Sequence, residues 1–230
     1  MSEKGIKLTT DCLELGCGED NLIFRAARLF FSKLNTSLGV KIHLVKRIPI
    51  AAGLGGGSSD AATALLGLNT LLNKPFSLDD LLEMAEKLGS DVSFFLYKKP
   101  AIAIGKGEKI ISLSFTLPFW YIIICPPVKV STAWAYEKAA LTKKEFQTKI
   151  NKPEVIIENL HNDLEKVVVE KFPEVAKAKV FLKKAGAKYI SMTGSGSSVF
   201  AVFYKKQDAL RVKKKLKLPQ RWQGFLVKGL

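Results

Sequence analysis

The chain has 230 residues, of which 47% are hydrophobic and 25% charged, a globular composition long enough for one large domain or two small ones. No run reaches the roughly 18 uncharged apolar residues of a membrane span, and the N-terminus lacks the apolar core of a signal peptide. The net charge of +15, from 36 Lys and Arg against 21 Asp and Glu, suits either nucleic acid or a small polyanionic ligand.

The first half of the chain mixes helix and strand patterns. Ala61, Leu65 and Leu68 recur at helical spacing, and Ser77 with Asp80 comes close to a capping box. His43 falls on the polar face of a predicted strand, where a solvated histidine is the favoured interpretation. In chain order we predict a helix capped by Asp20, a strand over residues 40–45, helices over 61–72 and 77–89, and strands over 101–104, 109–113 and 119–125.

Pro126-Pro127 is the best candidate for a boundary, which gives predicted domains 1–126 and 127–230. The positive charge is densest over residues 205–217, where a solvated helix face is the favoured explanation. Helices and antiparallel-type strands on both sides of residue 126 predict a two-lobed α+β fold. In chain order the second half is predicted to hold helices over 132–140, 153–169 and 173–185, strands over 189–192 and 199–203, the basic helix, and a strand over 222–227.

The segment Ala52-Gly-Leu-Gly-Gly-Gly-Ser-Ser-Asp60 places four glycines among five residues before a helix. Glycines let backbone N–H groups converge, and the helix start adds unpaired N–H groups and the positive end of its dipole. These features predict a phosphate site in which Ser58 and Ser59 offer hydroxyls to phosphate or magnesium. The segment does not match the Walker phosphate-binding loop, and it matches the dinucleotide-binding glycine motif only weakly. The alternative is a purely structural turn between a strand and a helix, but such a turn needs only one or two glycines. Asp60 is interpreted as a helix cap.

Three segments, in this order, resemble the motifs of the GHMP kinase superfamily: Pro49–Ala62, Leu88–Phe95 and Ser191–Phe200. Three consecutive glycines followed by Ser-Ser-Asp-Ala-Ala resemble, within it, the 4-diphosphocytidyl-2-C-methyl-D-erythritol kinases. The resemblance implies a two-lobed GHMP kinase fold, with a glycine-rich phosphate loop and left-handed crossover in the N-terminal lobe and a ferredoxin-like C-terminal lobe. It also implies ATP- and Mg2+-dependent phosphorylation of the 2-hydroxyl of that alcohol, in non-mevalonate isoprenoid precursor biosynthesis.

The resemblance further implies roles for individual residues. Asp91 would be the catalytic aspartate that accepts the substrate hydroxyl's proton, partly desolvated because a hydrophobic run follows it. ATP would bind at Ala52, Gly53, Leu54, Gly55, Gly56, Gly57, Ser58 and Ser59, with Ser58 also a metal ligand. The substrate would contact Lys106, Thr132, Tyr136, Thr193, Gly194, Ser195 and Gly196. The structural alternatives are an N-cap for Asp91 or Thr132, a hairpin-tip charge for Lys106, a packed helix face for Tyr136 and a plain turn for residues 193–196.

The family's first motif, with an active-site lysine, has no counterpart before Asp20. We therefore expect the chain to lack an N-terminal segment, which would leave sheet edges unpaired and could leave an inactive nucleotide-binding form. Two other functions stay open as alternatives. The chain could be a GHMP kinase that acts on mevalonate derivatives or homoserine, or it could be a nucleic-acid-binding protein. The odd count of three cysteines favours a reduced protein. We expect a cytoplasmic monomer or homodimer that binds ATP and a small substrate, without nucleic acid or membrane.

Overall fold

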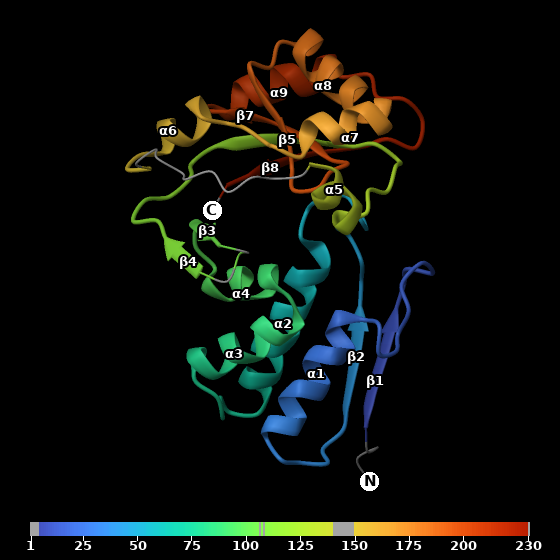
Figure 1. The fold of residues 1–230 in the computed structure, drawn as a ribbon, viewed down its shortest axis with the longest axis vertical. Coiled ribbons are helices and arrows are strands. Elements are labelled where there is room, and N and C mark those ends of the chain that lie inside the picture. The colour runs from blue at the N-terminus through green and yellow to red at the C-terminus, as the bar shows by residue number, and fades with distance from the viewer. Residues whose placement is uncertain (1–4, 106, 108, 140–149, 230) are drawn as a thin grey trace. The chain divides into compact units, whose positions relative to one another are not determined.

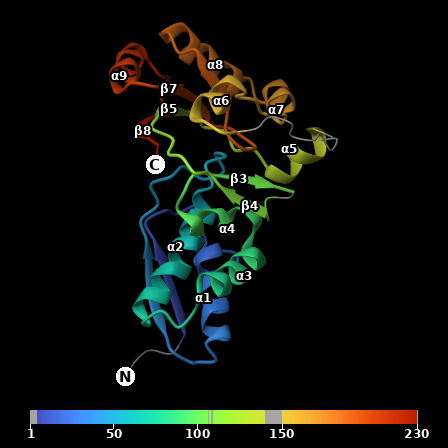
Figure 2. The same cartoon turned by 90° about the vertical axis from the view of Figure 1, so that its left-hand side faces the viewer.

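The computed structural model describes residues 5–105, 107, 109–139 and 150–229 (Figures 1 and 2). The chain divides into two compact units, the first formed by Met1–Ile48 with Gly55–Leu113 and the second by Pro49–Leu54 with Ser114–Leu230. The glycine-rich run is therefore divided, because its residues up to Leu54 fold with the second unit and those from Gly55 onward fold with the first. The domain boundary at residue 126 stays a prediction. Within the described ranges, no helix combines the length and apolar character needed to cross a membrane.

The first unit contains a parallel pair of strands, a set of packed helices and an antiparallel hairpin. Helix α2 is central, since α1, α3 and α4 all pack against it (Figure 1). Phe30, Leu65, Met84 and Val92 are at most 2% exposed in the resulting core. The elements are β1 (Ile6–Thr10), α1 (Leu22–Lys33), β2 (Val40–Leu44), α2 (Gly56–Leu71), α3 (Leu78–Leu88), α4 (Ser90–Tyr97), β3 (Ala101–Ile104) and β4 (Lys109–Ser112).

Helix starts in the first unit test the capping predictions. Helix α1 is capped by Asn21, whose side chain accepts the Ile23 N–H at 2.9 Å, so the prediction of Asp20 was wrong by one residue. The capping box at the start of α3 is confirmed, because Ser77 and Asp80 exchange side-chain-to-backbone hydrogen bonds. Helix α4 was not predicted, since eight residues are too few to establish a helical period.

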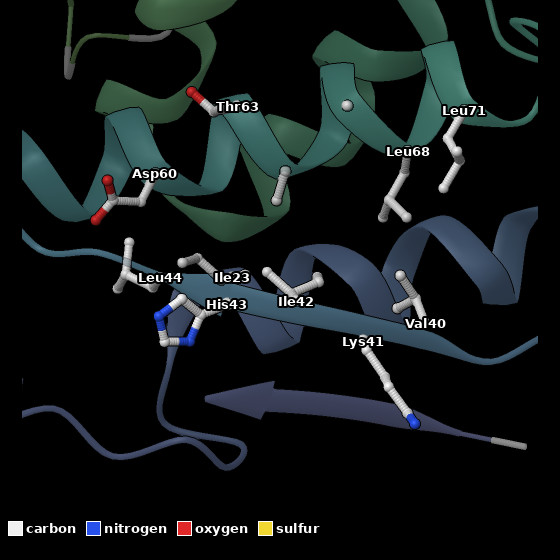
Figure 3. A pocket seen from close by; sticks show the side chains of 12 residues that line it. Ile23, Val40, Lys41, Ile42, His43, Leu44, Asp60, Thr63, Leu68 and Leu71 are labelled. Atoms are coloured by element: carbon white, nitrogen blue, oxygen red, sulfur yellow. The ribbon is translucent and has the colours of Figure 1, made fainter. Parts of the chain in front are cut away.

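An apolar hollow of about 410 Å³ lies beside β2 and α2 (Figure 3). Val40 and Ile42 of β2 and Leu68 and Leu71 of α2 line it, and Leu71 is 70% exposed. His43 is exposed, and its Nδ1 lies 2.9 Å from the Thr9 hydroxyl of β1, which confirms the interpretation of a solvated histidine. Among the described strands β2 pairs with β1 alone, so its other edge is unpaired.

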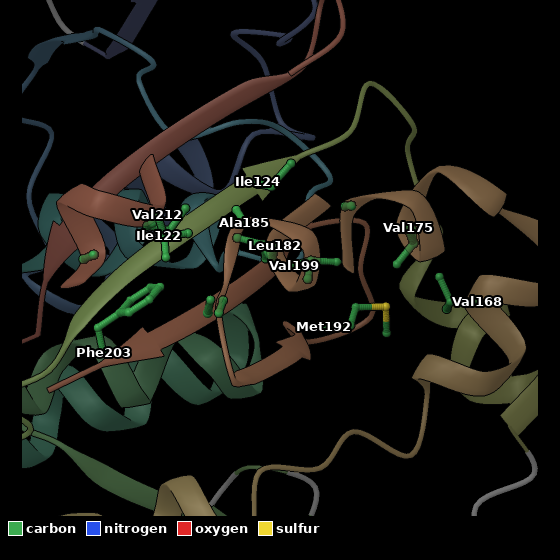
Figure 4. Packing of buried hydrophobic residues seen from close by; sticks show 14 of the residues in the cluster. Ile122, Ile124, Val168, Val175, Leu182, Ala185, Met192, Val199, Phe203 and Val212 are labelled. Atoms are coloured by element: carbon green, nitrogen blue, oxygen red, sulfur yellow. The ribbon is translucent and has the colours of Figure 1, made fainter. Parts of the chain in front are cut away.

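The second unit is a four-stranded antiparallel sheet in the order β6-β7-β5-β8. Helical segments join β5 to β6 and β7 to β8, and this topology is the predicted ferredoxin-like arrangement. Figure 4 shows the buried side chains, among them Ile122 and Ile124 of β5, Leu182 of α8 and Val199 of β7. The elements are β5 (Trp120–Cys125), α5 (Thr132–Ala139), α6 (Pro153–Glu158), α7 (Glu165–Lys171), α8 (Pro173–Ala185), β6 (Tyr189–Met192), β7 (Val199–Phe203), α9 (Lys206–Lys215) and β8 (Gln223–Lys228).

The helix predicted over residues 153–169 is two helices, α6 and α7, separated by residues 159–164. Polar side chains in this gap satisfy backbone groups that a continuous helix would use, which favours a break. The Asn159 side chain donates to the Val155 carbonyl at 2.8 Å, and the Asn162 side chain accepts the Leu164 N–H at 2.9 Å. The break puts Asn162 in a loop, where it can reach other parts of the unit.

The basic helix is confirmed as α9. Ala209 and Val212 are buried, while the lysines of the last turn, residues 213–215, are exposed. The lysine-rich face of this helix is therefore solvated, as the sequence favoured.

Candidate active site

In the second unit, the start of the glycine-rich run lies against the turn between β6 and β7. Thr193 Oγ1 donates to the Gly53 carbonyl at 2.9 Å. The Ser198 N–H donates to the Ala52 carbonyl at 3.1 Å. Because 140 residues separate Thr193 from Gly53, the fold has brought two predicted ligand-binding segments into direct contact.

The start of the glycine-rich run and the β6–β7 turn lie so close together that neither has room for a side chain at the glycine that faces the other. Gly53 has φ +71°, and a Cβ there would lie 2.3 Å from the Thr193 carbonyl oxygen and 2.8 Å from that of Gly196. Gly194 has φ +52°, and its Cβ would lie 3.1 Å from the Gly53 carbonyl oxygen. Both positions combine a left-handed backbone with close backbone approach, so glycine is required at each. The Gly196 N–H donates to the Thr193 carbonyl at 2.9 Å, so residues 193–196 form a β-turn, and the role of this turn in binding stays a prediction.

Side chains from other elements fix the second turn. Thr132 Oγ1, at the start of α5, lies 2.9 Å from the Ser195 hydroxyl. Asn162 Nδ2 donates to the carbonyls of Met192 at 2.8 Å and Gly194 at 2.9 Å. The sequence analysis did not select Asn162; the signal that could have found it is the polar gap inside the predicted helix.

A buried thiol lies behind this turn. Burial raises the pKa of the Cys125 thiol, and a hydrogen bond from Ser198 Oγ to Cys125 Sγ at 3.1 Å lowers that pKa only in part. A thiol with a raised pKa is a poor nucleophile. Cys125 is therefore a packing residue of β5.

In the first unit, α2 begins inside the glycine-rich run. Its N-cap is Gly55, with φ +64°, and no side chain caps the helix. The first turn, Gly56 to Ser58, therefore presents backbone N–H groups and the positive end of the helix dipole. Ser58, in this turn, and Ser59, which follows it, are half-buried. An uncapped helix start of this kind can bind an anion such as a phosphate group.

Two further glycines make close packing possible at the start of α2. A Cβ on Gly55 would lie 2.8 Å from a ring atom of Phe95, and one on Gly56 would lie 2.9 Å from Ile48 Cγ2. Gly57 has only ordinary van der Waals contacts around its Cβ position. With Gly53, three of the run's four glycines are sterically constrained, which exceeds the one or two that a simple turn would need.

Lys46 is a buried cation beside this helix start, and the sequence analysis did not select it. Its ammonium pairs with the Asp60 carboxylate, and the two side chains are 6% and 20% exposed. A Cβ on Gly56 would come within 3.0 Å of Lys46 Nζ, which places the ammonium beside the first turn of α2. The interpretation of Asp60 as a helix cap was wrong, because its carboxylate binds Lys46 and α2 has no side-chain cap.

We expect Lys46→Met to lower the free energy of unfolding by about 3 kcal/mol, because it leaves a largely buried carboxylate without its partner. Urea unfolding measures this loss. The double variant Lys46→Met/Asp60→Leu should recover most of it, since no buried charge then remains unpaired. If the double variant instead lost as much stability as the two single variants together, the proposed coupling between Lys46 and Asp60 would be wrong.

Asp91 lies in the first turn of α4, after the N-cap Gly89. No side chain caps α4, so the N-cap alternative for Asp91 is not realised. Asp91 is exposed, and the expectation of partial desolvation was wrong because the hydrophobic run after it turns inward as a helix. Phe95 lies one turn later on the same helix face, and its ring reaches Gly55. Asp91 is therefore on the face of α4 that meets the start of α2.

Two predicted substrate residues have less definite positions. Lys106 lies outside the described residues. At its neighbour Gly107, a Cβ would lie 3.2 Å from Ser90 Cβ, so Gly107 packs at the start of α4. Tyr136 is 55% exposed on α5, one turn after Thr132, and does not lie on a packed face.

Known proteins match both halves of the chain. Residues 21–99 match the GHMP kinases N terminal domain, and residues 144–219 match the GHMP kinases C terminal family. A relative from Syntrophotalea carbinolica named 4-diphosphocytidyl-2-C-methyl-D-erythritol kinase is 41% identical over 226 residues, which cover 96% of this chain and 81% of the relative.

Solved structures agree with these matches. A crystal structure of 4-(cytidine 5'-diphospho)-2C-methyl-D-erythritol kinase has a TM-score of 0.76 and 32% identity, over 99% of this chain and 84% of that one. A homoserine kinase from Cytophaga hutchinsonii has a TM-score of 0.75 at 21% identity, over 100% and 83% of the two chains, and shares the fold. The chain belongs to the GHMP kinases, which are ATP-dependent small-molecule kinases, and within them to the 4-diphosphocytidyl-2-C-methyl-D-erythritol kinase family.

Proposed function

We propose that the chain transfers the γ-phosphoryl group of ATP to the 2-hydroxyl of 4-diphosphocytidyl-2-C-methyl-D-erythritol, a step in non-mevalonate isoprenoid precursor biosynthesis. The 41% identity to a relative of that name supports the substrate. The observation that carries the reaction type is the glycine-rich run, which ends at an uncapped helix start and is bonded through Gly53 to the β6–β7 turn.

The residues of the run fit a triphosphate. Phosphoryl transfer needs held phosphates, a neutralising cation and an oriented hydroxyl. Glycine at positions 53, 55 and 56 lets neighbouring atoms pack directly against the loop backbone, and the first turn of α2 offers N–H donors. Magnesium bound to the phosphates would neutralise part of their charge, and Ser58 is the hydroxyl in the first turn that could ligate it.

Asp91 is our candidate for the group that handles the proton. A carboxylate oxygen can accept a hydrogen bond from the substrate hydroxyl and take its proton as the new P–O bond forms. In the second unit, the hydroxyls of Thr132 and Ser195 are 2.9 Å apart and can exchange this mutual hydrogen bond for bonds to the substrate. Lys106 and Tyr136 remain candidates for substrate contacts.

A coupled assay of ADP release tests the proposal. We expect turnover with the diphosphocytidyl alcohol and none above background with mevalonate, phosphomevalonate or homoserine. A higher kcat/KM with one of the last three would assign a different GHMP reaction. Binding of ATP without turnover of any alcohol would identify an inactive nucleotide-binding form. Gly56→Val is the negative control, since its side chain would collide with Ile48 at the start of α2.

A further inference from the structure

The positive charge of the chain is concentrated between residues 171 and 228. This segment has 15 Lys and Arg against two acidic residues, Glu174 and Asp208, so its net charge is +13, and the rest of the chain contributes only +2. The segment forms α8, β6, β7, α9 and β8 of the second unit. Charges of one sign that are gathered in one part of a fold attract ligands of the opposite sign.

A hollow of about 570 Å³ lies within this segment. It is bounded by the end of α8, the first residue of β6, the last residues of β7 and one face of α9, and the two helices pack against each other (Figure 1). Ala185, Val202 and Val212 are at most 6% exposed and give the hollow an apolar lining. A hollow of this size holds a small organic molecule.

Three cationic side chains line the hollow. Arg211 and Lys215 lie on the same face of α9 as Asp208, and Lys188 comes from the connection between α8 and β6. Asp208 is the one carboxylate among the lining residues, and its Oδ1 lies 3.6 Å from Arg211 Nη1. Lys188 and Lys215 are exposed and have no ion-pair partner among the described residues. The lining therefore has a net charge of +2, which matches a phosphate monoester better than a carboxylate.

Helix dipoles explain only one of these cations. Lys215 is in the last turn of α9, where a positive charge is favourable, but Arg211 comes before that turn. Lys188 comes after Gly186, the C-cap of α8. The last carbonyls of α8 are already satisfied, because the N–H groups of Gly186 and Ala187 donate to carbonyls of the last turn at 3.0 Å. The end of α8 therefore does little to repel an anion.

Two tyrosines form another part of the lining. The rings of Tyr189 and Tyr204 pack edge to face with their centroids 6.4 Å apart, and Tyr204 is 46% exposed. Desolvation raises the pKa of Tyr204, and Tyr189 and the carboxylates of Glu154 and Glu158 raise it further. The Tyr204 hydroxyl therefore stays protonated and can donate a hydrogen bond. The nearby carboxylates also make the tyrosine end the less positive end of the hollow.

The hollow is separate from the predicted substrate turn of the same unit. Strands β6 and β7 pair so that Tyr189 lies opposite Val202 and Met192 lies opposite Val199. The turn at residues 193–196 follows Met192, whereas the hollow lies at the Tyr189 end. At about 3.3 Å per residue, β6 separates the two places by about 10 Å. A ligand in the hollow thus leaves the turn free.

We propose that this hollow binds a small phosphorylated molecule, whose phosphate is held by Lys188, Arg211 and Lys215 and whose uncharged part lies against Tyr189 and Tyr204. The site is independent of the proposed function, since it uses neither the glycine-rich run nor Asp91. An exposed guanidinium and two ammonium groups can converge on one phosphate, with the guanidinium donating two parallel hydrogen bonds.

Phenyl phosphate is the probe, because it combines a phosphate dianion with one aromatic ring. By calorimetry in about 0.15 M salt we expect a Kd of about 1 mM, and binding of inorganic phosphate that is at least about tenfold weaker. Tyr204→Ser should remove most of this preference, because it takes away the ring against which the phenyl group lies. Failure of the unmodified protein to bind phenyl phosphate below about 10 mM would overturn the site.

The variant Lys188→Gln/Arg211→Gln should bind phenyl phosphate about tenfold more weakly. Lys213→Gln/Lys214→Gln is the matched control, because it removes the same charge from exposed positions of α9 that do not line the hollow. We expect its affinity for phenyl phosphate to stay within about twofold at this salt concentration. Phosphate binding at the start of α2 would be common to all these proteins, so the difference between the two variants reports on the hollow alone.

A single-stranded oligonucleotide separates a free phosphorylated molecule from nucleic acid as the source of the phosphate. We expect the oligonucleotide to bind more weakly than phenyl phosphate at about 0.15 M salt. Tight oligonucleotide binding that falls equally in the two double variants would instead assign the whole basic surface to nucleic acid and overturn the site. Equal losses of phenyl phosphate affinity in the two variants would overturn it as well. The presence or absence of kinase turnover changes none of these outcomes.

Discussion

Gly53→Ala is expected to abolish detectable ATP binding and to lower the free energy of unfolding by about 3 kcal/mol. The added Cβ would lie 2.3 Å from the Thr193 carbonyl oxygen, and backbone, unlike the end of a long side chain, cannot move aside cheaply. The left-handed φ of +71° adds strain of its own. The substitution should therefore separate the phosphate loop from the β6–β7 turn. Calorimetry with ATP and urea unfolding measure the two losses.

Gly67→Ala is the control for this variant. Gly67 lies inside α2, nothing surrounds its Cβ position within 4 Å, and its backbone is helical. The exchange should raise the free energy of unfolding by about 0.5–1 kcal/mol and leave ATP affinity unchanged. If Gly53→Ala behaved like Gly67→Ala, the contact between the two turns would have no role in binding.

Features with a local cause could be predicted from the sequence. The capping box at Ser77 and Asp80 spans four residues and needs no tertiary contact. The glycine-rich run could be assigned to a phosphate loop because its composition and the following helix lie in one short segment. The cap of α1 was misplaced, since Asp20 and Asn21 are adjacent and both residue types are good caps.

Features that depend on distant partners could not be predicted. The bond between Thr193 and Gly53 joins residues 140 positions apart, and no local pattern encodes it. Lys46 resembles any charged residue at the end of a strand until the fold places Asp60 beside it. Asn162 looked like part of a long helix, because a periodic apolar pattern on both sides masked the break.

The glycines show the same difference most clearly. In the sequence, each glycine of the run indicated only that the backbone there is conformationally free. In the structure, three of these glycines each pack against a specific neighbour. Gly53 meets the β6–β7 turn, Gly55 meets Phe95 and Gly56 meets Ile48. The run is thus constrained by packing as well as by its ligand, and a substitution in it can fail for either reason. A test of chemistry alone has to be made elsewhere.

Asp91→Asn provides that test. The amide keeps the shape of the side chain in the first turn of α4 but cannot accept the hydroxyl proton. We expect kcat with the diphosphocytidyl alcohol to fall by about 10²–10⁴-fold, while the Kd for ATP stays within about twofold. Steady-state kinetics and calorimetry separate the two effects.

Asp79→Asn is the matched control, because Asp79 is an exposed aspartate in the first turn of α3 and interacts with that helix dipole in the same way. It should change kcat by less than about twofold and stability by only a few tenths of a kcal/mol. If Asp91→Asn matched this control, Asp91 would be no more than a favourable first-turn charge, and the proton would have to leave through another group. A large loss of kcat with unchanged ATP affinity would instead assign the carboxylate to the reacting hydroxyl, since packing and the dipole are the same in both variants.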